Sequence, residues 1–139
     1  MRFQITTDYA IRIILYMAQQ DMQVITAKEA ATQLGITYSY FNKVAAKIKI
    51  EGFIESVQGP KGGYRLAKDA SDITLYDIVK AMEGSICINR CLEADGFCSG
   101  NAISVCPVHQ IMGSIQFKMI EMLSGIRICD LIHKEAFEI

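Results

Sequence analysis

The chain has 139 residues, of which 51% are apolar and 21% charged, so it can bury the core of one domain, with or without a dimerisation arm. Its net charge of −1 combines a basic half (nine Lys and Arg against five Asp and Glu in residues 1–68) with an acidic half (five against ten in residues 69–139), which favours a polyanionic partner for the first half. No apolar run is long enough to span a bilayer and no signal-peptide pattern opens the sequence, so we expect a cytoplasmic protein without a membrane partner.

Three helices are predicted at the start of the chain, at residues 8–20, 27–34 and 37–50. The first is apolar on nearly every side, and Thr6 or Thr7 is its predicted cap. Thr26 opens the second helix in a capping box with Glu29, and Gly35 ends it. Two helices joined by a turn that contains glycine predict a helix-turn-helix.

A β-hairpin and a further helix are predicted next, with strands at 53–57 and 64–66, a turn at 58–63 and a helix at 74–82. Three Gly and one Pro in the six turn residues cannot continue either regular structure. Gly84 ends the helix. The predicted fold class is therefore mainly α with a small hairpin wing, a winged helix-turn-helix domain over residues 1–84.

A cysteine-rich loop and a long helix are predicted to complete the chain. Residues 85–106 have no clear period and hold four of the five Cys; a loop of this length is unusual unless a bound metal orders it. Residues 107–123 have helical periodicity with an apolar stripe, and Pro107 suits the first turn. The stripe needs a partner, most simply a second copy, so residues 107–139 are expected to form a dimerisation helix and C-terminal tail.

DNA contacts are expected at the start of the third helix and on the wing. N-terminal residues of a recognition helix face base edges and phosphates, which suits Asn for adenine and hydroxyls or Lys for phosphate. The wing is placed for the backbone or the minor groove. The predicted contacts are Tyr38, Ser39, Tyr40, Asn42, Lys43, Gln58, Lys61, Gly62 and Arg65. At least one of the two Tyr is expected to pack on the core instead.

Three cysteines and one histidine form the predicted metal site. Cys91, Cys98 and Cys106 are soft ligands that suit iron–sulfur clusters or zinc. The gaps of six and seven residues between them exceed the short knuckle spacings usual for zinc. His109 follows Cys106 by three residues, so both were expected on one helix face and within reach of one metal, although a surface or capping role for His109 stays open. Cys87 is expected to be a bystander, and Cys129, in an apolar segment, part of the core.

These residues carry a family resemblance that runs over nearly the whole chain. The sequence resembles the Rrf-two family of bacterial regulators in Asp8-Tyr9-Ala10, Thr37-Tyr38-Ser39-Tyr40 and Gly59-Pro60-Lys61-Gly62-Gly63-Tyr64. Cys91, Cys98 and Cys106-Pro107-Val108-His109 resemble the iron–sulfur members of the IscR and NsrR type. The resemblance implies a dimer crossed by the long helix and a 2Fe–2S or 4Fe–4S cluster on the three Cys. The fourth ligand is His109 in the first pattern, and Asp8 of the other subunit in the second.

The function expected from these features is DNA-binding regulation. The chain has no Walker loop, nucleophile elbow or paired-carboxylate arrangement, so it is not expected to be an enzyme. We predict a homodimeric repressor of a palindromic operator, controlled by an iron–sulfur cluster that senses cluster status, nitric oxide or redox state. The alternative is a cluster-free winged-helix regulator that contains thiols or zinc and acts through a partner protein.

Overall fold

The structure, a computed structural model, describes residues 1–133; residues 134–139 of the predicted C-terminal tail lie outside the described part. Its helices are α1 (Ile5–Gln19), α2 (Ala27–Leu34), α3 (Tyr38–Ile50), α4 (Leu75–Glu83), α5 (Pro107–Gly125) and α6 (Ile128–Ile132). Strands β1 (Ile54–Val57) and β2 (Gly63–Leu66) pair antiparallel, and 3-10 turns occupy η1 (Ala70–Asp72), η2 (Arg90–Leu92) and η3 (Ile103–Val105). The predicted mainly helical class with a hairpin wing is confirmed.

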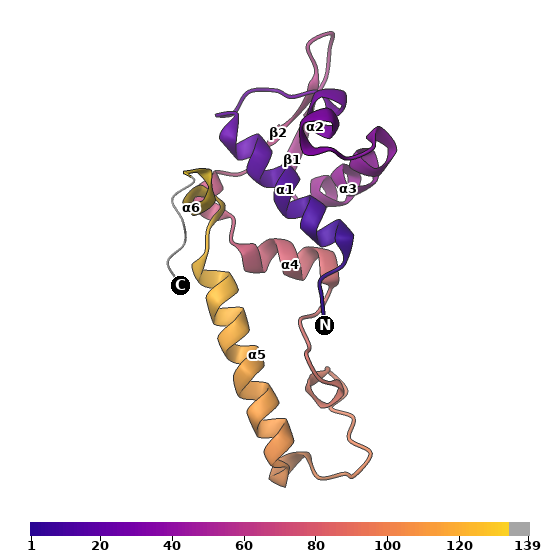
Figure 1. The fold of residues 1–139 in the computed structure, drawn as a ribbon, viewed down its shortest axis with the longest axis vertical. Coiled ribbons are helices and arrows are strands. Elements are labelled where there is room, and N and C mark those ends of the chain that lie inside the picture. The colour runs from indigo at the N-terminus through magenta and orange to yellow at the C-terminus, as the bar shows by residue number, and fades with distance from the viewer. Residues whose placement is uncertain (134–139) are drawn as a thin grey trace.

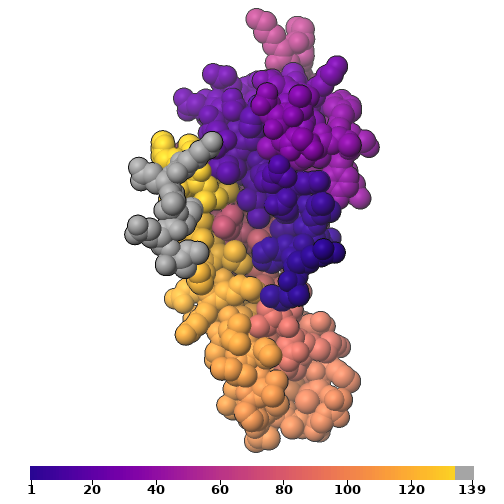
Figure 2. Space-filling view, viewed as in Figure 1, coloured from indigo at the N-terminus to yellow at the C-terminus, as the bar shows by residue number. Residues whose placement is uncertain are grey.

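The molecule divides into a head and a stalk. Figure 1 shows the head, made of α1, α2, α3 and the hairpin, and below it the stalk, in which α5 runs alongside the cysteine loop. The space-filling view shows the same stalk protruding under the head, with the wing tip at the opposite end (Figure 2). Within residues 1–133, no helix has both the length and the apolar character needed to cross a membrane.

The two helices of the helix-turn-helix begin and end as their local sequence predicts. The Thr26 hydroxyl accepts from the backbone N–H of Glu29 at 3.1 Å, which is the first half of the predicted capping box. Gly35 ends α2 with a left-handed φ of 65°. Thr37 caps α3 by accepting from the N–H of Tyr40 at 3.2 Å. Because both caps are local, the turn between α2 and α3 is encoded in a few neighbouring residues.

The start of α1 differs from its prediction. The helix begins at Ile5, and Thr7 lies inside it, fully buried, so neither Thr6 nor Thr7 is the cap. Instead, the Glu83 carboxylate at the end of α4 accepts from the Gln4 N–H at 2.8 Å and from the Thr7 hydroxyl at 2.5 Å. A negative charge there satisfies N–H groups that a helix start leaves unpaired, and it complements the helix dipole.

The core surrounds α1, which packs against α3, α4 and α6. Its Ile13 and Ile14 are fully buried. One face of α3 is buried, at Phe41, Val44, Ala45 and Ile48, which recur at helical spacing in the sequence. Burial of this face leaves the opposite side of α3 for solvent or a partner.

The wing is attached to the head by backbone pairing as well as by its side chains. Ile25 and Tyr64 exchange hydrogen bonds of 2.9 and 2.8 Å, which adds the segment before α2 to the edge of β2. A Cβ at residue 63 would collide with the Ile25 carbonyl, so this close approach requires Gly63. The Tyr64 ring packs on Phe41 of α3, with 6.1 Å between centroids. The wing and α3 are therefore held in one fixed relation.

The segment after α5 contains a short helix, α6, that was not predicted from the sequence. Arg127 bridges to Thr74, and the Ile128 N–H donates to the Ile73 carbonyl at 2.9 Å, which returns the chain to the head. Ile128 of α6 is fully buried, whereas Cys129 is only half-buried. The prediction that Cys129 belongs to the core is wrong, because its neighbour takes the inward position on a helix that turns by about 100° per residue.

Candidate nucleic-acid interface and metal centre

The start of α3 exposes most of the predicted DNA-reading side chains. Tyr38, Ser39 and Lys43 are exposed, with 59% of Tyr38 accessible, and Asn42 is half-buried. Tyr40 differs from them, because its ring packs edge-on against Tyr9 at 5.2 Å between centroids and against the core. The expectation that one of the two Tyr packs on the core is confirmed for Tyr40. Tyr38 remains the tyrosine with an accessible ring and hydroxyl.

The wing presents its polar side chains at the turn between β1 and β2. Gln58 and Lys61 are exposed there. Gly62 closes the turn by donating its N–H to the Gly59 carbonyl at 2.9 Å, and a Cβ at residue 62 would collide with the Val57 carbonyl. Its identity is thus explained by turn geometry alone.

Arg65 on β2 already has an ionic partner. Its Nε lies 2.6 Å from Oε1 of Glu55, the residue directly opposite on β1. Both side chains remain accessible, at 42% for Arg65 and 46% for Glu55. The prediction that Arg65 contacts DNA did not include this carboxylate.

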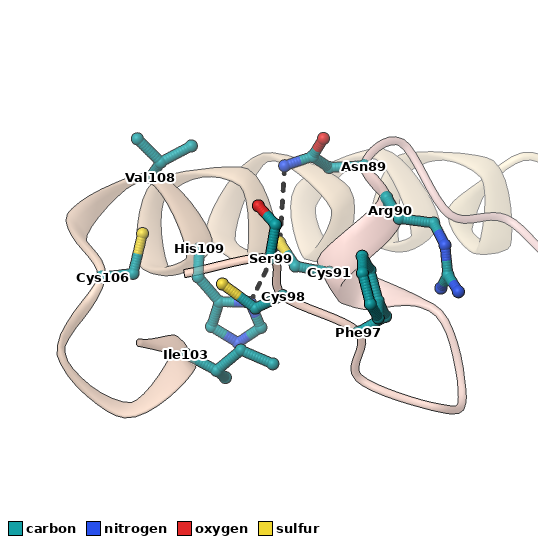
Figure 3. Close-up of a pocket in the computed structure, with 10 residues that line it drawn as sticks. All are labelled: Asn89, Arg90, Cys91, Phe97, Cys98, Ser99, Ile103, Cys106, Val108 and His109. Carbon is teal, nitrogen blue, oxygen red and sulfur yellow. Dashed lines mark hydrogen bonds between the residues drawn. The ribbon is translucent and has the colours of Figure 1, made fainter. Parts of the chain in front are cut away.

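Three of the five cysteines and one histidine line a single pocket of about 250 Å³ in the stalk. Cys91 comes from η2, Cys98 from the following turn, and Cys106 and His109 from the start of α5. Figure 3 shows these side chains on the walls of the pocket together with Asn89, Phe97 and Ile103. The fold thus brings together the thiols and the imidazole that the sequence predicted as ligands.

The loop that carries Cys91 is fastened to α5. The Ile88 N–H donates to the Gln116 side chain at 3.0 Å, and Leu92 packs over Gly113, where an added Cβ would lie 3.6 Å from the Leu92 methyl carbon. These contacts place η2 against the middle of the long helix. The cysteine loop and α5 are therefore joined by direct contacts and form one structural unit.

An ion-pair brace shapes the part of the loop between Cys91 and Cys98. The Arg90 guanidinium donates to both carboxylate oxygens of Asp95 at 2.5 and 2.6 Å and lies 5.1 Å from the centroid of the Phe97 ring. These hydrogen bonds lower the pKa of Asp95 to about 2 and raise the pKa of Arg90. The brace closes residues 90–95 into a short loop, which contains Cys91 and ends three residues before Cys98.

Hydrogen-bond donors point at two of the sulfur atoms. Cys91 Sγ lies 3.3 Å from His109 Nδ1, and the Asn89 amide donates to the same sulfur at 3.4 Å (Figure 3). At Cys98, backbone N–H groups of residues 102, 100 and 101 lower the pKa of the thiol. Donors of this kind stabilise a thiolate, which is the form that binds metal.

The position of Cys106 differs from the prediction that it shares a helix face with His109. Cys106 is the N-cap of α5 with an extended backbone, so the rule for residues three apart on a helix does not apply to it and His109. His109 contacts Cys91 instead. Figure 3 shows Cys106 set apart from the other two cysteines.

The pocket fits a soft metal group by its donor set and is wider than a single-ion site. Three thiols and an imidazole are ligands that iron and zinc accept. Among residues 1–133, however, no three His, Cys, Asp or Glu side chains come close enough to hold one ion. A closed zinc site needs four ligands within about 2.0–2.3 Å of one metal.

The other candidates lie outside this pocket. Asp8 is exposed on the first turn of α1, where it forms an ion pair with Arg12 at 3.6 Å and lines a separate hollow with residues 2–5. Cys87 donates its thiol to the Leu92 carbonyl at 3.4 Å. Within one chain, His109 is therefore the candidate fourth ligand that shares the pocket with the three cysteines.

Comparison with known proteins identifies the family. The profile of the Rrf2 family, described as iron-dependent transcriptional regulators, matches residues 3–134. The chain belongs to the Rrf2 family. It is 31% identical to Protein aau3 of Rhizobium meliloti over 95% of this chain and 85% of that protein. It is 26% identical to the HTH-type transcriptional regulator IscR of Escherichia coli, over 97% of this chain and 82% of that protein.

Solved structures show the same fold. CymR, the global cysteine regulator of Bacillus subtilis, superposes with a TM-score of 0.77 over 98% of this chain and 99% of its own, at 18% identity. Membership in the Rrf2 family confirms the predicted family resemblance and makes the chain a DNA-binding transcriptional regulator rather than an enzyme.

Several side chains that shape these two sites were not predicted from the sequence. Asn89, Gln116 and the Arg90–Asp95 brace surround the cysteines, and Glu55 faces Arg65. Only Glu55 had a partial signal, since it and Arg65 lie in the two strands of one predicted hairpin. The predicted turn at residues 58–63 is one residue longer than the observed turn and would pair Glu55 with Leu66 instead. The others depend on how the loop folds back on α5.

Proposed function

We propose that this Rrf2-family regulator is a cytoplasmic homodimeric repressor whose binding to a palindromic operator is controlled by an iron–sulfur cluster in the cysteine pocket. The observation that carries the proposal is the convergence of Cys91, Cys98, Cys106 and His109 on one pocket beside α5. Cytosolic thiols stay reduced, so clustered cysteines there favour metal or redox chemistry over structural disulfides.

In this proposal the three cysteines and His109 hold the cluster, and His109 rather than Asp8 is the fourth ligand. His109 shares the pocket, whereas Asp8 would have to come from the partner subunit and give up its ion pair with Arg12. When bound, the cluster would supply iron whose nitrogen-ligated position is more easily lost or attacked by a small molecule than a thiolate-ligated one. Asn89 donates a hydrogen bond to the Cys91 sulfur, and the backbone N–H groups around Cys98 stabilise the thiolate form of Cys98.

The contacts at both ends of the loop support a route from the pocket to the DNA. At one end, Gln116 fastens the loop to α5. At the other end, the loop leaves α4 directly after Met82 and Glu83; Lys47 of α3 donates to the Met82 carbonyl at 2.9 Å, and Glu83 caps α1. A loop that is ordered or released therefore acts on the dimer helix and, through Lys47, on the recognition helix.

The exposed stripe of α5 supports a homodimer. None of the α5 residues is fully buried, and large apolar side chains along it are about half exposed: Val108 by 52%, Ile111 by 55%, Ile115 by 49% and Met122 by 60%. A second copy covers such a stripe by two-fold symmetry. The same symmetry presents two recognition helices to half-sites about one helical turn apart.

Anaerobic purification with iron, sulfide and zinc analysis tests the cluster. Wild type is expected to be coloured and to carry iron and sulfide, and the triple Cys91, Cys98, Cys106→Ala variant to carry neither. Cys129→Ala, which removes a thiol outside the pocket, is the matched control and should keep the wild-type absorption spectrum. His109→Ala should change that spectrum and Asp8→Ala should not. A colourless wild type with stoichiometric zinc, and no iron uptake on reconstitution, would contradict the proposal.

A second candidate is a cluster-free thiol regulator that acts through a partner protein. The observation that favours it is the 3.3 Å contact between Cys91 Sγ and His109 Nδ1, which places an imidazole directly beside a thiol. The fold likeness to CymR, named as a cysteine regulator, agrees with it. A wild type that binds no iron but changes its DNA affinity on reversible thiol oxidation, and loses this response in Cys91→Ala, would establish it.

A further inference from the structure

We propose that Glu55 is a specificity-determining residue of the wing. Glu55 holds Arg65 in an ion pair, and Arg65 leaves this pair only for DNA whose minor groove is narrow and strongly negative, as in A-tracts. The inference rests on DNA binding by α3 and the wing. Glu55 would influence which DNA sequence is bound through Arg65, without contacting the bases itself.

The hairpin geometry makes this pair the resting state of Arg65. Glu55 and Arg65 are directly opposed in the antiparallel register, and Arg65 Nε lies 2.6 Å from the Glu55 carboxylate. Side chains alternate along a strand, and the neighbouring Tyr64 packs inward on Phe41. Arg65 therefore points away from the core, as its proposed contact with DNA requires.

The pair is not needed to hold the wing together. The backbone ladder between β1 and β2, the exchange of hydrogen bonds between Ile25 and Tyr64, and the burial of Leu66 already fix the hairpin. Both charged side chains stay more than two-fifths exposed. An exposed ion pair is weak, so a stronger negative potential can take the arginine from it.

The charge of the wing determines which DNA can compete with Glu55 for Arg65. Between residues 54 and 66 the cations are Lys61 and Arg65 and the acid is Glu55, so the carboxylate halves the positive charge that the wing offers. The backbone phosphates of general DNA must compete with Glu55 for Arg65, and the Glu55 carboxylate also repels them. A narrow A-tract groove concentrates negative potential and attracts inserted arginine. Glu55 thereby weakens binding to general DNA more than to A-tract DNA.

Fluorescence anisotropy over a salt series tests the proposal on the full-length dimer. The probes are two labelled duplexes of equal length, one built of A-tracts and one GC-rich. Glu55→Gln should bind the GC-rich duplex more tightly than wild type, with a log–log salt slope steeper by about one phosphate contact. The gain on the A-tract duplex should be smaller, so the ratio of the two affinities falls. Glu51→Gln, which removes an exposed carboxylate from the end of α3, should change both affinities alike.

The arginine background separates this role from general charge removal. In the Arg65→Ala protein, adding Glu55→Gln should no longer alter the ratio of affinities. Equal gains on both duplexes, no gain at all, or a gain that survives in the Arg65→Ala background would overturn the role of Glu55. A wild type that binds neither duplex at low salt would overturn the DNA-binding face itself, and with it this proposal. Thermal melting of each variant shows whether a change reflects lost folding.

Discussion

Replacement of Ile115 by Asp is expected to dissociate the proposed dimer. Ile115 lies in the middle of the α5 stripe and is 49% exposed in the single chain. Full burial of an Ile side chain contributes about 1.5–3 kcal/mol, so covering the exposed half contributes about 1 kcal/mol per chain and about 2 kcal/mol per dimer. Loss of this burial alone raises the dimer Kd about 30-fold. The aspartate adds the cost of moving a carboxylate into an apolar interface, so the actual change should be larger.

Sedimentation equilibrium or light scattering over a concentration series measures this change. The matched control is Phe117→Asp, because Phe117 is also apolar and 67% exposed but lies off the stripe of α5. Its dimer should resemble wild type, whereas Ile115→Asp should be monomeric at micromolar concentration and bind DNA poorly. A wild type that is itself monomeric at micromolar concentration would refute the reasoning. Equal dissociation of both variants would place the interface on a different face of the helix.

Three further outcomes are expected. Asn42→Ala should relax base preference at one operator position by about 1–3 kcal/mol in competition against substituted duplexes, and an unchanged preference would remove Asn42 from base readout. Because the pKa of Asp95 is lowered to about 2, its pairing with Arg90 is intact above the ordinary value of 3.8 and is lost as the pH falls towards 2. In an NMR titration, Arg90→Ala should move the titration midpoint of Asp95 up towards 3.8. An unchanged midpoint would show that Arg90 does not pair with Asp95. Glu83→Ala should lower the free energy of unfolding in urea by about 1–3 kcal/mol, since the buried Thr7 hydroxyl loses its acceptor. Thr7→Val in that background should restore part of the loss.

Much of the head could be predicted because its signals are local. Thr26 and Gly35 bound α2 within ten residues of one another, and the inward face of α3 follows from helical periodicity alone. The hairpin is set by its glycine-rich turn. Each of these features depends on neighbours in the chain, so the order of elements needs no knowledge of the rest of the fold.

The residues of the candidate metal site were predicted from the sequence, but their arrangement was not. Residue chemistry and spacing identified Cys91, Cys98, Cys106 and His109, and the fold lines one pocket with all four. The contact of His109 with Cys91, rather than with its neighbour Cys106, arises because η2 folds back onto α5. That packing depends on small residues and amides of the long helix, which have no pattern of their own in the sequence.

The sequence by itself determined the class of protein and the helix-turn-helix with its wing, and it named the candidate residues for metal and DNA binding. Tertiary structure alone decided that Glu83 caps α1 from 79 residues away and that α6 returns to bury Ile128. The physical reason is the range of the interactions. Caps, turns and periodicity act between residues a few positions apart, whereas these two contacts form only when distant segments have packed, and their partners cannot be recognised before that packing is known.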